Sequence, residues 1–184
     1  MRFIRVRWKC FIIPILCIWI LSSSLVSARS LKNICLTAQE KDVVSIDSII
    51  EALYESITFS EGKEPNLERL RSLFHPKAPF IRFTPQGVHE MDLSSFISSF
   101  GDRVKSGQLK SFHESEIFRK MESYGSIAQA FSTYQKGMNT ENPEEYGRGI
   151  NSIQLYNDGQ RWWIASITWE DEQPTNPIPS KYIR

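Results

Sequence analysis

Hydrophobic positions recur at two different spacings along the chain, and the change divides it into a helical part and a β-rich part. From Val43 to Ile57 aliphatic residues return every three or four positions, which predicts an amphipathic helix of about four turns. Shorter stretches with the same period follow Asn66 and Asp92, two residues that cap helices well. Between them, Phe80–Thr84 is typical of a short strand. We therefore expect helix, helix, strand and helix in this order.

The pattern from Ser111 to Glu170 predicts four antiparallel strands. The runs of the first hairpin, 111–138, meet at Tyr124-Gly125, and those of the second, 148–170, meet at Asp158-Gly159. Asp-Gly is typical of a tight type I′ turn, because both central residues take positive φ. Helices followed by such a meander predict an α+β fold, in which a curved antiparallel sheet wraps around the N-terminal helices.

One face of the second hairpin is predicted to line the interior. Counting outward from Asp158-Gly159 places Leu155 opposite Trp162 and Ile153 opposite Ile164, an apolar face. The residues of this face that we expect to bind a ligand are Asn151, Ser166, Thr168 and Trp162. Buried polar groups must be satisfied by partners, water or ligand, so a polar network filling the mouth of the fold is the alternative.

The opposite face of this hairpin also carries large apolar groups, so it needs a cover. The same counting places Arg148 opposite Trp169, a favourable cation–π pair. Aromatic residues and arginine are typical of subunit interfaces, which predicts a homodimer. The predicted interface residues are Arg148, Ile150, Gln154, Trp163, Ile167 and Trp169. Cover by the tail Pro174–Tyr182 is the alternative.

The first hairpin holds two candidates for catalysis, His113 and Tyr134. Pivoting on Tyr124-Gly125 places His113 opposite Lys136, and the pattern does not decide which face of this hairpin points inward. A histidine can act as acid or base near neutral pH, and Glu114 or Glu116 could orient or repel it. A surface histidine beside Lys136 is the alternative.

The first 28 residues are typical of a secretory signal. Four basic residues precede an apolar run, and Val26-Ser27-Ala28 offers the small residues that a signal peptidase needs. The alternative, an uncleaved anchor, is disfavoured because the run is shorter than the ~20 residues that span a bilayer. We expect cleavage after Ala28, export to the periplasm or the extracellular space, and a flexible leader over 29–42.

Composition excludes several classes of function for the exported chain. Removing the four basic residues of the signal from the 22 in the chain leaves 18 against 21 acidic ones, a net charge near −3. A slightly acidic chain without a basic stripe argues against nucleic acid as a partner. Cys35 is the one cysteine left, so no internal disulfide is expected, and three unclustered histidines predict no metal site. No phosphate-binding loop or other cofactor motif occurs.

The order of elements resembles the nuclear transport factor 2-like superfamily, a cone-shaped α+β domain shared by ketosteroid isomerases, polyketide cyclases and scytalone dehydratase. Leu73-Phe-His-Pro76 before the first strand and the Asp-Gly-x-x-Trp motif within Leu155–Ile164 carry this resemblance. It implies a domain over 43–172, followed by a Pro-rich tail over 173–184. It also implies a pocket enclosed by the bent sheet and the helices, and a dimer through the outer sheet face. The enzymes use a carboxylate base or a His–Asp pair with a tyrosine, and no local motif here matches theirs.

These observations favour an exported protein that binds a small, mostly apolar organic molecule in the cone, with no cofactor, metal or membrane partner after signal removal. A lyase or isomerase is the second hypothesis, in which His113 or a nearby carboxylate moves a proton while Tyr134 and Asn151 steady an oxyanion. The third is a protein-interaction module that works through the aromatic sheet face.

Overall fold

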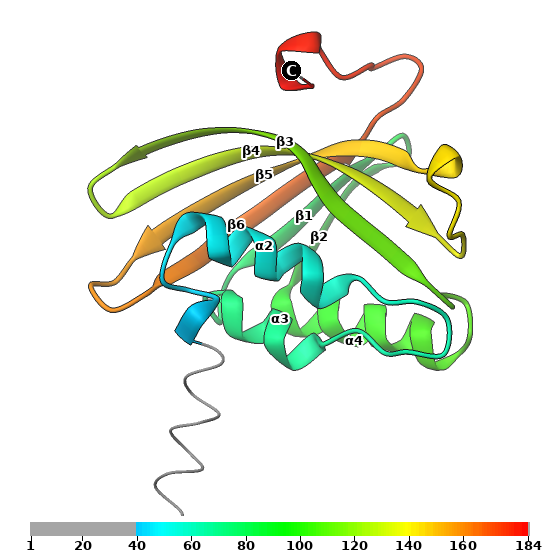
Figure 1. Cartoon of the computed structure of the whole chain (residues 1–184), viewed down its shortest axis with the longest axis horizontal. Helices are drawn as coiled ribbons and strands as arrows, with labels where there is room; N and C mark the ends of the chain where they lie inside the picture. Colours follow the sequence, from blue (N-terminus) through cyan, green and yellow to red (C-terminus); the bar gives the residue numbers. More distant parts are fainter. Residues whose placement is uncertain (1–39, 184) are drawn as a thin grey trace, which may run out of the picture. The chain divides into compact units, whose positions relative to one another are not determined.

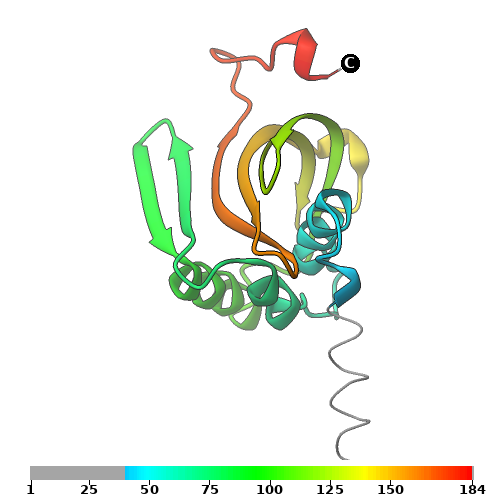
Figure 2. The same ribbon diagram turned by 90° about the vertical axis from the view of Figure 1, so that its left-hand side faces the viewer.

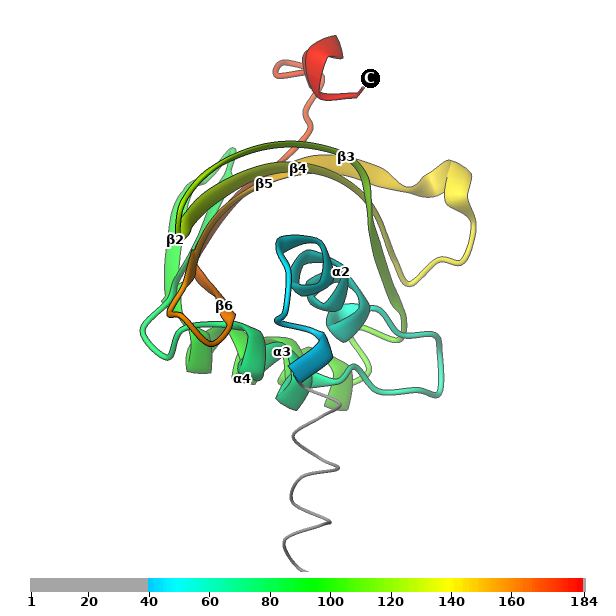
Figure 3. The same ribbon diagram turned by 60° about the vertical axis from the view of Figure 1, so that its left-hand side comes forward.

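The computed structural model describes residues 40–183, which lie within one compact unit. The predicted signal over 1–28, and the leader up to residue 39, lie outside the described residues. The helices of this unit are α2 (Ile46–Ile57), α3 (Leu67–Leu73) and α4 (Leu93–Lys105). They lie on the concave side of a curved sheet, which arches over α2 (Figures 1 and 3). Within residues 40–183, no helix has the length and apolar character of a membrane span.

Each helix begins at a polar residue that satisfies its free N–H groups. The Asn66 side chain accepts from the Arg69 N–H at 3.0 Å, and the Asp92 side chain accepts from the Ser95 N–H at 2.7 Å, as the sequence predicts. Ser45 caps α2 and exchanges hydrogen bonds with Ser48, so this helix begins three residues later than its hydrophobic period.

The sheet has the strand order β2-β1-β6-β5-β4-β3. All neighbours are antiparallel except β1 and β6, which are parallel. The strands are β1 (Pro79–Thr84), β2 (Gly87–Asp92), β3 (Phe112–Tyr124), β4 (Ile127–Met138), β5 (Gly147–Asn157) and β6 (Trp162–Asp171). Strand β2 was not expected, because its residues are almost all exposed at the sheet edge and show no apolar alternation. The α+β fold with a curved sheet around the helices is confirmed.

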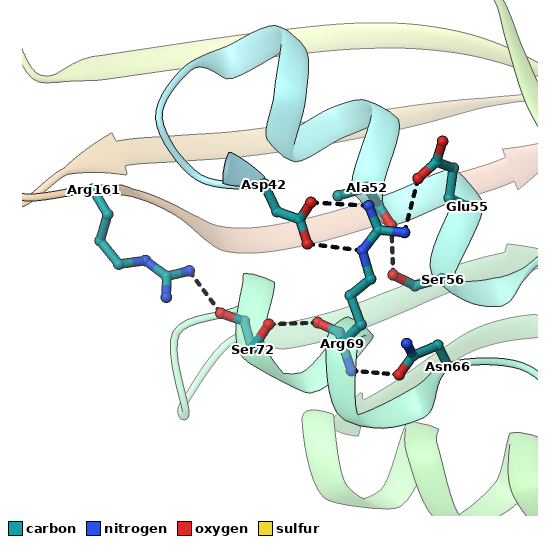
Figure 4. Close-up of polar contacts among 8 residues, drawn as sticks. All are labelled: Asp42, Ala52, Glu55, Ser56, Asn66, Arg69, Ser72 and Arg161. Carbon is teal, nitrogen blue, oxygen red and sulfur yellow. Dashed lines mark hydrogen bonds and ion pairs between the residues drawn. The ribbon is translucent and has the colours of Figure 1, made fainter. Parts of the chain in front are cut away.

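A partly buried arginine, Arg69, links helices α2 and α3. Arg69 of α3 donates two hydrogen bonds to Asp42, at 2.7 and 2.9 Å, and forms an ion pair with Glu55 of α2 at 2.8 Å (Figure 4). At the other end of α3, Arg161 of the β5–β6 loop donates to the Ser72 carbonyl at 2.6 Å. Side chains therefore link α3 to α2 and to the loop between β5 and β6.

The register predicted for the second hairpin is wrong. Asp158–Arg161 form a four-residue loop, in which the Asp158 side chain accepts from the N–H groups of the two residues before Trp162. Leu155 therefore faces Ile164, and a bulge at Ala165 follows. Because one extra residue reverses the faces of a strand, the rest of β6 points opposite to the prediction.

The first hairpin turns at Gly125-Ser126, one residue beyond the predicted pivot. A bulge at Ile117 then shifts the register by one more residue. Because of the turn and the bulge together, His113 faces Gly137, and Glu114 faces Lys136 on the concave side. The structure thus places Glu114 toward the interior and its neighbour His113 away from it.

The C-terminal tail lies on the convex side of the sheet, away from the helices (Figure 2). The Thr133 hydroxyl donates to the Tyr182 carbonyl at 2.6 Å, and the Tyr182 ring packs against Phe131 with centroids 4.9 Å apart. Thr133 is completely buried as a result. The tail therefore covers part of the outer face, as the alternative interpretation expected.

Candidate functional site

A cavity of about 130 Å³ lies between the concave face of the sheet and the helices. Most of its wall is apolar and aromatic. The residues that form this apolar wall include Phe80, Phe96, Phe100, Phe112, Ile167 and Trp169. A cavity of similar size in another protein, about 150 Å³, stays dry and takes up benzene. The space therefore suits a molecule of about one ring.

One end of the cavity is polar. Glu114 near the start of β3 faces Lys136 near the end of β4, and Asn151 of β5 reaches Glu114 through a side-chain hydrogen bond. Tyr134 precedes Lys136 by two residues and points to the same side of β4. The lining also contains two arginines, Arg82 of β1 and Arg103 of α4.

Glu114 is the carboxyl group that contacts the cavity directly. Asn151 Nδ2 donates to its Oε1 at 3.2 Å. Burial raises the pKa of Glu114 to about 7, although Lys136 and the Asn151 hydrogen bond oppose the rise. Glu114 also borders a groove between α2 and β3, which leaves its side chain partly exposed. The group can therefore exchange a proton near neutral pH.

Asp171 is held in the opposite state by three donors. Its Oδ1 accepts from the Tyr134 hydroxyl at 2.5 Å and from Lys136 Nζ, and its Oδ2 accepts from Arg82 at 3.0 Å. Burial alone raises the pKa of Asp171, but these donors outweigh it and hold the pKa below its usual range. Burial and the nearby Asp171 raise the pKa of Tyr134, which therefore stays protonated.

Close packing against Gly149 positions Tyr134. A Cβ atom at Gly149 would lie 2.1 Å from the Tyr134 Oη and 2.6 Å from the Glu170 carbonyl oxygen. Only glycine leaves room for the phenol to reach Asp171 at this point of β5. Gly149 therefore allows Tyr134 to take the position from which it donates to Asp171.

A second chain of hydrogen bonds supports Asn151 from behind. Asn151 Nδ2 also contacts the Tyr54 Oη at 3.2 Å, and Tyr54 shares a 2.6 Å hydrogen bond with Ser132. Ser132 in turn donates to Glu116, which forms an ion pair with Arg119 at 3.2 Å. Part of the polar network that the sequence left as an alternative is therefore present, and it orients the Asn151 amide toward Glu114.

The four predicted ligand-binding residues do not lie on the same side of the sheet. Asn151 lines the cavity. Ser166 and Thr168 face outward with Gln154 and Ser152, because the bulge at Ala165 reverses this part of β6. Trp162 packs against the core near the loop and does not line the cavity.

Two predicted interface residues also change sides. Ile167 and Trp169 line the cavity, so the placement of these two residues on the outer face is wrong. Arg148 pairs with Glu172 at 2.8 Å instead of Trp169, and the guanidinium of Arg161 lies 3.7 Å from the Trp163 ring centre. The residues that remain on the outer face are Arg148, Ile150, Gln154 and Trp163. A homodimer through them stays a prediction.

The two candidates for catalysis are separated as well. Tyr134 lies inside the cavity, but His113 points outward, where its Nε2 lies 2.8 Å from Glu141 and its ring stacks on Tyr146. From the sequence, Glu114 is named only as a partner for His113, and Asp171 is not named as a candidate. A count of alternating positions from the correct turn would still place Glu114 outside, because the bulge at Ile117 is what turns it inward. No local signal marks this bulge or the bulge that brings Asp171 inward.

No cluster of three or more metal-ligating side chains occurs within residues 40–183. The polar groups that line the cavity are ammonium, guanidinium, phenol and amide groups with one carboxyl group, Glu114, and this set suits an organic ligand better than a divalent cation.

Comparison with known proteins identifies the fold. No family model matches the chain, and no curated protein does. A ketosteroid isomerase-like structure from Parabacteroides distasonis is 13% identical, with 73% of this chain and 98% of that chain covered and a TM-score of 0.51. Hexachlorocyclohexane dehydrochlorinase LinA-type3 from Novosphingobium barchaimii is 9% identical, with 78% and 91% covered and a TM-score of 0.51. An NTF-2-like protein of unknown function from Silicibacter pomeroyi is 17% identical, with 78% and 98% covered and a TM-score of 0.45.

At these identities the likeness extends to the fold and to no activity. The helices beneath a curved sheet, with the order of elements that the sequence predicts, agree with the resemblance drawn from Leu73–Pro76 and Leu155–Ile164. The chain has the nuclear transport factor 2-like fold.

Proposed function

We propose that the protein binds a small, mostly apolar organic molecule in the cone cavity. The observation that carries this proposal is an aromatic cavity of about 130 Å³ with a polar end formed around Glu114 and Lys136. Ligand sites typically combine apolar walls with a few polar groups that orient the ligand. An interaction module would need no such space, because its cone could be filled by side chains.

A matched pair of isoleucines tests the proposal. Ile167 lines the cavity, whereas Ile150 lies on the outer face of the neighbouring strand. Toluene and benzyl alcohol should bind the purified protein with a Kd of about 0.3–1 mM, because seven or eight non-hydrogen atoms at roughly 0.6 kcal/mol each give about 4–5 kcal/mol. Calorimetry should show that Ile167→Phe abolishes this binding and Ile150→Phe does not. Equal binding by both variants would contradict a site inside the cone.

Glu114 favours a second function, general acid–base catalysis in the same cavity. A carboxyl group with a pKa of about 7 can take a proton from a bound molecule and return it at another position. Among residues 40–183, Lys136 has one hydrogen-bond partner, Asp171, so two of its three N–H groups remain to stabilise a developing oxyanion. Tyr134 is less suited to this role than the sequence indicated, because its one proton is donated to Asp171.

Proton transfer can be tested without knowing the natural substrate. Cyclohexanone fits the expected size, and NMR follows exchange of its α-hydrogens for solvent deuterium. We expect the protein to accelerate this exchange and Glu114→Gln to lower the acceleration by about 10²–10⁴-fold, the range for loss of a general base. His113→Ala should leave the rate unchanged, because His113 lies on the other side of the sheet. The absence of any exchange that depends on Glu114 would contradict the catalytic function, and ligand binding would remain as the proposed function.

We also propose export, and its support is the sequence of residues 1–28. Mass spectrometry of the protein recovered from an exporting host should show Arg29 as the first residue. A chain that retains residue 1 would contradict cleavage after Ala28.

A further inference from the structure

The lining of the cavity carries more positive than negative charge. Three cationic side chains belong to it, Arg82, Arg103 and Lys136. The carboxyl groups beside them are Glu114 and Asp171, so one positive charge remains even when both are ionised. An enclosed site with excess positive charge attracts anions, since the low-polarity walls do not screen it as water does.

One of these cations has a buried donor without an acceptor within residues 40–183. Arg82 Nε is buried without a hydrogen-bond partner, although the same guanidinium donates to Asp171 through Nη2. Arg103 forms no ion pair with any carboxylate of the described residues. A buried donor without a partner is costly, so Arg82 Nε calls for an acceptor, and Arg103 keeps its charge unpaired at the cavity wall.

We propose that the ligand is a small organic monoanion, a carboxylic acid with a one-ring or branched apolar body. Its carboxylate would accept hydrogen bonds at the Arg82, Arg103 and Lys136 end, because a guanidinium matches the two oxygens of a carboxylate. Its apolar body would lie among the phenylalanines and Trp169 of the wall. This inference rests on the proposed function and adds the chemical class of the ligand.

Compounds of equal size and different charge test the ligand class. Calorimetry compares benzoate, benzyl alcohol and benzylamine with the same protein. We expect benzoate to bind on the order of 10-fold or more tightly than benzyl alcohol, the effect of a charge-assisted hydrogen bond, and benzylamine to bind most weakly. Equal affinities for benzoate and benzyl alcohol would overturn the inference.

Two arginine variants test whether the preference for benzoate arises in the cavity. Arg103→Gln should lower the affinity for benzoate about 10-fold and change that for benzyl alcohol less than about 2-fold. Arg148→Gln is the control, since Arg148 pairs with Glu172 on the outer face. An unchanged benzoate affinity in Arg103→Gln would overturn the assignment.

The outcomes separate the inference from the proposed function. Binding of benzyl alcohol that Ile167→Phe abolishes, without any preference for benzoate, would overturn the anionic class and keep the cavity as a site. Failure of all three compounds to bind would overturn both.

Discussion

Glu114 and Asp171 lie at the same polar end of the cavity, and the structure drives their pKa values in opposite directions. Both are removed from much of the solvent, and both lie near Lys136. Asp171 accepts from three side chains and has a lowered pKa, whereas Glu114 accepts from one amide and has a pKa of about 7. The number of donors aimed at a carboxyl group therefore decides its protonation here, since burial acts on both in the same sense.

This difference assigns separate roles to the two groups. A pair of carboxyl groups with separated pKa values is typical of sites that use one as an acid or base and the other as a fixed charge. Asp171 holds Lys136, Tyr134 and Arg82 in place, and Glu114 remains free to gain or lose a proton. Variants that change one carboxyl group or its partners at a time test this difference.

The largest expected effect comes from Gly149→Ala, which would remove a donor from Asp171. The new methyl group would overlap the Tyr134 phenol and the Glu170 carbonyl, so the phenol must leave Asp171 or the strand must shift. We expect a loss of about 3 kcal/mol or more in the free energy of unfolding, measured in urea. Gly147→Ala on the same strand is the control, because a Cβ there meets nothing within 4 Å. Equal stability of both variants would contradict the packing of Tyr134.

The pH dependence of stability reports on Glu114 itself. Because its pKa in the folded protein is about 7, above the 4.5 of an ordinary glutamate, the folded state binds the proton more tightly. Its contribution is fully present below pH 4.5 and is lost as pH rises toward 7. We expect the wild type to lose about 2 kcal/mol relative to Glu114→Gln between pH 4.5 and 7.5, less than the pKa difference alone implies, since the side chain keeps some contact with solvent. A constant difference across this range would argue against a raised pKa.

Removal of the Asp171 carboxylate should change the pKa of Glu114, although the two groups form no hydrogen bond with each other. Asp171→Asn leaves Lys136 and Arg82 without their counter-charge, and we expect a loss of about 2 kcal/mol of stability. The negative charge of Asp171 also helps to raise the pKa of Glu114, and Lys136 lowers it. The pKa of Glu114 should therefore fall in this variant, which NMR titration measures. An unchanged Glu114 pKa would show that the two carboxyl groups are not coupled.

The smallest effect is expected from the contact between His113 and Glu141 on the outer face. Glu141 is mostly exposed, so Glu141→Gln should change stability by less than about 1 kcal/mol. His113→Ala should likewise leave the affinity for benzyl alcohol unchanged in calorimetry. A large loss of binding in His113→Ala would contradict the separation of the two faces of β3.

The sequence predicts the helices and most strands because their signals are local. The period of Val43–Ile57 and the caps Asn66 and Asp92 need no knowledge of the rest of the chain. Strand β2 lacks such a signal, since it pairs only with β1 at the sheet edge and stays exposed.

The site was less predictable, because it depends on register. The extra loop residues after Asp158 and the bulges at Ile117 and Ala165 each shift the count. A shift of one residue exchanges the two faces of a strand, so Trp169 and Thr168 change places, as do Glu114 and His113. The bulges lie in β3 and β6, and the pairing of β4 with β5 contains no shift. The sequence could therefore name Asn151 of β5 and Tyr134 of β4 as candidates for the site.

The most direct test is a carboxyl ¹³C NMR titration of the purified protein, with Glu114→Gln and Asp171→Asn to assign the two resonances. The account predicts a pKa of about 7 for Glu114 and a pKa below the ordinary range for Asp171 in the same sample. A Glu114 pKa near 4.5 would contradict the claim that this cavity holds a carboxyl group ready for proton exchange at neutral pH.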